Sequence, residues 1–163
     1  MMAIILEGPS DRTILEREVG VAEQRGEPRD GAVQQVVRSE HRRLGEQFVE
    51  LARVFDETGA QDELRDAFAA LYEELDVHFE QEDRLYYSSI RALRPDLAPE
   101  IREISAAHHR FRLQLGAIGD QLGRGDVRAA REGFATLAAD YRQHEAREEA
   151  LLQRIDPTLA PTP

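Results

Sequence analysis

Apolar side chains recur every three or four residues along four stretches of the chain, which is the spacing of a single helix face. These stretches cover residues 32–58, 62–93, 99–122 and 127–155. Gly59, Pro95 and Gly123 interrupt the pattern, and Asp126 is placed to cap the last stretch. Because long helices joined by short connections pack antiparallel, we expect an all-α fold, an up-down-up-down four-helix bundle.

The ends of the chain differ from this periodic part. Residues 1–31 are rich in glycine and mixed charges, and we interpret them as an N-terminal extension or linker, with a short helix over residues 11–19. Three prolines mark residues 157–163 as a flexible tail. The bundle is therefore predicted to span residues 32–156.

Ionisable residues stand on the apolar face of every predicted helix. Each face carries one histidine, and two of the faces also carry a glutamate four residues further on: His41; His78 and Glu82; His108; His144 and Glu148. A spacing of four puts the histidine and the glutamate on the same side of a helix. The face that holds His78 is expected to continue inward through Leu85 and Ser89.

The two halves of the chain repeat each other. His41 and His78 are 37 residues apart, and His108 and His144 are 36 apart. His78-x-x-x-Glu82 answers His144-x-x-x-Glu148, and a leucine, Leu85 or Leu151, follows each glutamate by three positions. Each histidine lies about 18 residues, or roughly 27 Å of helix, from its hairpin turn. The four histidines are therefore predicted to meet at one level of the bundle.

A layer of four imidazoles and two carboxylates needs a physical justification inside an apolar core. Burying an ionised group costs on the order of several kcal/mol unless it is paired or binds a metal. The chain has no cysteine, which excludes disulfides, iron–sulfur clusters and thiolate zinc sites. Nitrogen and carboxylate ligands inside a helix bundle favour a two-metal centre of iron or manganese over a four-ligand zinc site. Iron is preferred, and the residues leave manganese open.

Simpler interpretations hold for the same residues taken singly. A lone histidine on an apolar face is more often a hydrogen-bonded core residue, and the tyrosines are expected to serve in packing. His109 lies about 100° around the helix from His108 and is expected at the surface. A metal-free helical module that binds a partner is the third alternative, and it leaves the buried layer without a role.

Charge and hydropathy narrow the classes of function. A net charge of −11 with scattered arginines provides no basic patch for nucleic acid. We find no apolar run long enough to span a bilayer and no signal peptide, so we expect no membrane partner and a cytoplasmic location. The oligomeric state is left open.

The ordered series of His41, His78-x-x-x-Glu82, His108 and His144-x-x-x-Glu148 resembles the hemerythrin-like HHE cation-binding family over about residues 35–155. The resemblance implies two non-haem iron ions bridged by Glu82 and Glu148. It also implies that a small diatomic molecule or peroxide binds at an open iron position. We therefore expect a protein that binds or senses oxygen, nitric oxide, peroxide or iron itself. The alternative is a di-iron enzyme that decomposes hydrogen peroxide or reduces nitric oxide.

One position departs from the family pattern. Oxygen-carrying hemerythrins have a second histidine on the third helix, four residues after the first, and Arg112 stands there in this chain. This departure weakens the case for a reversible oxygen carrier and favours a sensor or a reactive centre. A neighbouring group such as Glu40, Glu149 or Tyr86 is available to complete the ligand set, and the sequence does not decide among them.

Overall fold

The computed structural model describes residues 29–57 and 61–155, with side chains from residue 35 onward. The N-terminal extension, the short helix expected over residues 11–19 and the tail all lie outside the described residues, apart from the first turn of the first bundle helix.

Helices make up nearly all of the described chain, which confirms the all-α prediction. A π-helix, Glu82–Tyr86, joins α3 to α4, and a short 3₁₀ turn, Pro95–Leu97, joins α4 to α5. The α-helices are α2 (Arg29–Glu57), α3 (Gln61–Gln81), α4 (Tyr87–Leu93), α5 (Ala98–Gly123) and α6 (Val127–Ile155).

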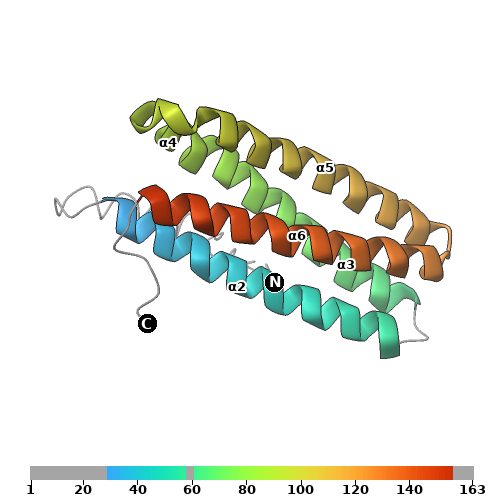
Figure 1. Cartoon of the computed structure of the whole chain (residues 1–163). Helices are drawn as coiled ribbons and strands as arrows, with labels where there is room; N and C mark the ends of the chain where they lie inside the picture. The colour runs from blue at the N-terminus through green and yellow to red at the C-terminus, as the bar shows by residue number, and fades with distance from the viewer. Residues whose placement is uncertain (1–28, 58–60, 156–163) are drawn as a thin grey trace, which may run out of the picture.

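The helices form a closed antiparallel bundle, as Figure 1 shows. Helix α2 packs against α3, α3 against α5, α5 against α6, and α6 returns to α2. The end of α2 and the start of α3 lie at the same end of the bundle as the α5–α6 turn (Figure 1). The sequence argument for a single histidine level depends on this arrangement.

The α5–α6 turn follows the predicted helix signals. Gly125 has a φ of 76°, a left-handed conformation that is strained for residues with a Cβ atom. Asp126 then caps α6, because its Oδ1 accepts a hydrogen bond of 3.1 Å from the backbone N–H of Ala129. The turn thereby sets where α6 begins, and with it the level of the ionisable residues on α6.

Two apolar clusters fill the bundle. The larger one includes Leu44, Phe68, Leu115 and Leu137 and lies toward the hairpin turns. The smaller one lies toward the opposite end and consists of Val37, Tyr86, Tyr87, Leu97, Ile101, Ile104, Leu151 and Leu152. On each long helix the ionisable residues fall between the members of the two clusters. The polar layer is thus closed off by apolar packing on both sides.

The π-helix corrects the predicted inward face of the second helical stretch. Leu85 is 52% exposed and Ser89 is exposed, so their predicted inward placement was wrong. The wider π turn advances the helix face by about one residue relative to an α-helix, and it turns Tyr86 and Tyr87 inward instead. The second half of the chain remains α-helical here, and Leu151 is fully buried.

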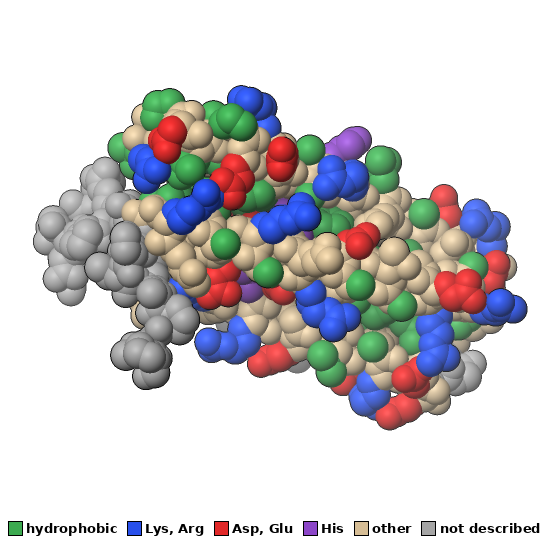
Figure 2. Space-filling view, in the orientation of Figure 1, with side chains coloured by type: hydrophobic (Ala, Val, Ile, Leu, Met, Phe, Trp, Pro, Cys, Tyr) green, Lys and Arg blue, Asp and Glu red, His purple; other side chains and the backbone are tan. Residues whose placement is uncertain are grey.

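The surface mixes charges of both signs. Arginine and acidic side chains are interspersed over the face shown in Figure 2. Within residues 29–57 and 61–155, no helix has the length and apolar character needed to cross a membrane.

Candidate metal centre

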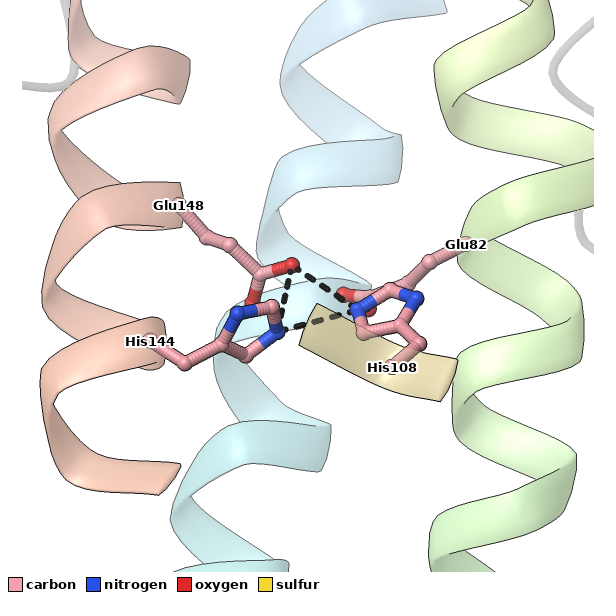
Figure 3. A group of neighbouring side chains, drawn as sticks. All are labelled: Glu82, His108, His144 and Glu148. Carbon is pink, nitrogen blue, oxygen red and sulfur yellow. Dashed lines mark hydrogen bonds and ion pairs between the residues drawn. The ribbon is translucent and has the colours of Figure 1, made fainter. Parts of the chain in front are cut away.

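The six side chains predicted from the sequence meet at one level of the bundle. His41 comes from α2, His108 from α5, and the remaining four from α3, the π-helix and α6. Five of the six residues are at most 4% exposed, and the side chain of His41 is 13% exposed. Figure 3 shows Glu82, His108, His144 and Glu148 pointing toward one another from three sides of the bundle.

These residues form two groups that share one glutamate. The inner group consists of Glu82, His108, His144 and Glu148, and the outer group consists of His41, His78 and Glu82. Within each group, one ligand atom from every residue lies within 4.8 Å of the others. Each group therefore has the dimensions of a site for one metal ion.

The four imidazoles present the same nitrogen to the two carboxylates. Nε2 of His41 and Nε2 of His78 each lie 3.4 Å from Oε1 of Glu82. Nε2 of His108 lies 3.3 Å from the other oxygen of Glu82, and Nε2 of His144 lies 3.1 Å from Oε1 of Glu148. The two remaining contacts, from Glu148 to His41 and to His108, measure 3.4 and 3.5 Å.

Burial and mutual repulsion set the charge states of this layer. Burial raises the pKa of Glu82 well above its usual value, and the nearby Glu148 raises it further. Burial alone would raise the pKa of Glu148 as well, but hydrogen bonds from His108 and His144 hold it well below the usual range. Burial lowers the pKa of His41 to about 4, so its imidazole is neutral at pH 7. Neutral imidazole is the form that binds metals.

Several polar atoms of the layer are left without hydrogen bonds. Among the described residues, His78 Nε2, Glu82 Oε2 and Glu148 Oε2 are buried and have no hydrogen-bond partner. Buried polar atoms are normally satisfied, so such a cluster calls for an explanation. The atoms are nitrogen and carboxylate oxygen, all facing the two groups, and this donor set fits metal ions such as iron or manganese.

Further polar residues hold the layer from outside. Oε2 of Glu40 lies 3.3 Å from Nδ1 of His78, and Oδ2 of Asp83 lies 3.2 Å from Nδ1 of His108. Such a carboxylate fixes the tautomer in which Nδ1 carries the proton and Nε2 is free to bind a metal. The hydroxyl of Tyr87 donates a hydrogen bond to Oε1 of Glu148.

The residues left open by the sequence lie in different places. His109 is exposed, as expected. Arg112 forms an ion pair with Asp76 on α3 and lies over the ring of Phe79, so its guanidinium is engaged away from the centre. Glu149 is exposed on the surface of α6, whereas Tyr86 is buried beside the layer.

The sequence did not single out Asp83 or Tyr87. Both follow Glu82 within the π-helix or directly after it, where the α-helical period no longer predicts which side chains face inward. The one available signal is a break in the internal repeat, because Tyr86 and Tyr87 correspond to the leucine pair at positions 151 and 152 only if one residue is inserted. That mismatch is too weak to identify by itself.

Comparison with known proteins agrees with this geometry. The family described as hemerythrin HHE cation binding domain matches residues 32–155. No curated protein matches the chain. No solved structure matches it either.

Proposed function

Because the chain belongs to the hemerythrin HHE cation-binding domain family, we propose that it is a non-haem di-iron protein. The proposed ligands of the two iron ions are His41, His78, Glu82, His108, His144 and Glu148. The centre binds or senses a small ligand, either oxygen, nitric oxide, peroxide or iron itself.

The observation that carries the proposal is the way the two carboxylates are turned. Oε1 of Glu82 faces the histidines of the outer group, and its Oε2 faces His108 of the inner group. Oε1 of Glu148 faces His144, and its Oε2 faces His41. A carboxylate with one oxygen toward each of two sites is suited to bridge two metal ions, so this arrangement supports two ions rather than one.

The donor atoms support iron in particular. Four imidazole nitrogens and two carboxylates offer no sulfur, and a tetrahedral zinc site would leave ligands unused. When bound, iron would supply a redox-active ion with positions open to small ligands. Manganese satisfies the same donor set, and metal analysis distinguishes the two.

A groove between α2 and α6 supports access by small molecules. Its volume is about 360 Å³, and its lining includes Phe48, Phe134 and Tyr141. The ring of Tyr141 has its centroid 6.2 Å from that of His144. An apolar groove that ends beside the layer suits uncharged diatomic molecules and peroxide.

The test is elemental analysis of protein reconstituted with ferrous iron, followed by absorption spectra with and without azide. We expect about two irons per chain and a charge-transfer band that responds to azide. Protein that takes up no iron, or that binds only zinc with a featureless spectrum, contradicts the proposal.

A neighbouring pair of histidines provides a matched control. His108→Ala removes a buried histidine of the inner group and should reduce the iron content. His109→Ala removes the adjacent exposed histidine and should leave iron content and spectrum unchanged. Full iron occupancy in both variants would show that the layer is not the binding site.

The second candidate is an enzyme that decomposes peroxide or reduces nitric oxide at the same centre. It is favoured by the position of Arg112, which is paired with Asp76 and supplies no ligand where oxygen carriers have a histidine. Fewer protein ligands leave more positions open for reaction. Peroxide turnover is compared between iron-loaded protein and an equal amount of free iron. Turnover no greater than that of free iron favours the binding or sensing function.

A further inference from the structure

The two proposed metal positions are not equivalent, and this difference rests on the proposed function. All four residues of the inner group are buried, with exposures between 0 and 4%. The outer group has three members, and His41 is its most exposed residue, with a side chain 13% in contact with solvent. A metal ion in the outer position is therefore closer to water and to competing ligands.

The inner position is also held more rigidly before any metal arrives. The ring of His108 stacks on Phe79 at 4.5 Å and on Tyr87 at 6.0 Å between centroids. Asp83 lies behind the same histidine, and the hydroxyl of Tyr87 holds Glu148. Ligands that are already oriented lose less conformational freedom when the metal binds.

The outer position has fewer such supports. Glu40 lies behind His78, but the polar contacts of His41 among the described residues are with Glu82 and Glu148 themselves. The ring of His41 meets only the edge of the His78 ring, at 5.1 Å. One of the two supporting contacts of each kind found in the inner group is therefore missing here.

Charge adds to the difference. The inner group contains both carboxylates, and the outer group shares Glu82 with it. A first cation in the inner position offsets part of the charge of Glu82 and repels a second cation nearby. Ligand charge and site rigidity both determine how tightly a cation is bound, as calcium sites show.

We propose that the two positions fill in sequence, with the inner one binding iron tightly and the outer one exchanging iron with the surroundings. The chain then changes between a one-iron and a two-iron form as the free ferrous iron concentration changes. This makes iron itself the ligand that the protein responds to.

The test uses the full chain, equilibrated without oxygen against a series of free ferrous iron concentrations set by a chelator. Iron per chain is measured at each concentration. We expect two steps with a plateau at one iron, separated on the order of 10–100-fold in free iron, the size typical of outer-contact effects on metal affinity. Loss of both ions in a single step overturns the inference but leaves the di-iron function standing. Protein that binds no iron at all overturns both.

Two matched variants assign the steps to positions. Asp83→Asn alters the carboxylate behind His108 and should shift only the tight step, whereas Glu40→Gln alters the one behind His78 and should shift only the weak step. Both residues are only partly buried, so the variants are expected to fold, and helical circular dichroism checks this. The reverse pattern, or equal shifts of both steps by either variant, overturns the assignment.

A ligand substitution gives an independent measurement. His78→Gln should abolish the weak step and leave one iron with the tight affinity of the parent protein. His144→Gln should remove the tight step. Retention of both steps in His78→Gln overturns the inference.

Discussion

The hydroxyl of Tyr87 donates a hydrogen bond to Oε1 of Glu148, a residue 61 positions later in the chain. Glu148 is one of the two carboxylates that face both metal positions. The contact exists because the π-helix before Tyr87 turns this side chain into the bundle, where its ring also stacks on His108. A local change in helix type thus reaches a residue on a different helix of the centre.

Tyr87→Phe should destabilise the metal-free protein by about 1–3 kcal/mol, because a buried carboxylate oxygen loses its hydrogen-bond donor. The ring and its packing are kept. Tyr86→Phe is the matched control, since the buried hydroxyl of Tyr86 has no hydrogen-bond partner among the described residues, and its loss should be nearly neutral. Chemical denaturation in the presence of a chelator measures both. Equal effects would show that the Tyr87 hydrogen bond contributes nothing.

The corrected register of the second helical stretch is tested with two leucines that occupy equivalent positions in the repeat. Leu85 is 52% exposed, so Leu85→Ala should change the free energy of unfolding by no more than about 0.5 kcal/mol. Leu151 is fully buried, so Leu151→Ala should cost about 2–5 kcal/mol through the cavity it leaves. A large loss in Leu85→Ala would favour a continuous α-helix in place of the π-helix.

His41 gives the metal-free protein a defined dependence on pH. Its pKa is about 4 in the folded state against 6.5 as the ordinary value, so between these values the unfolded chain binds a proton that the folded chain does not. The contribution of His41 to stability is therefore constant above pH 6.5 and falls as the pH drops toward 4, by up to about 3 kcal/mol. Denaturation at several pH values, compared with His41→Gln, isolates this loss from that of other groups. Parallel pH profiles for the two proteins would contradict it.

The α5–α6 turn provides a prediction about folding alone. Gly125→Ala places a Cβ atom on a residue with a φ of 76° and should lower the free energy of unfolding by about 1 kcal/mol. Gly123→Ala, two residues earlier and still in α5, has open space around the added Cβ and should be neutral or slightly stabilising. Thermal unfolding compares the two. Equal stability of both variants would show that the turn accommodates a side chain without strain.

Most of the fold and the six central residues were predictable because they depend on local rules. A helical period identifies which residues share a face, and a fixed rise per residue converts the distance from each turn into a level in the bundle. His41, His78, His108 and His144 therefore met where the sequence placed them. The prediction was wrong at Leu85 and Ser89, where the period changes without a recognisable signal.

The sequence by itself determined four amphipathic helices, their antiparallel order and one shared level for four histidines and two glutamates. Only the tertiary structure decided which oxygen of Glu82 and Glu148 faces which histidine, and it alone brought Asp83 and Tyr87 to the centre. The reason is that a π turn is disfavoured locally and persists only where packing and hydrogen bonds between helices stabilise it. Those interactions join residues far apart in the chain, so no window of the sequence contains them.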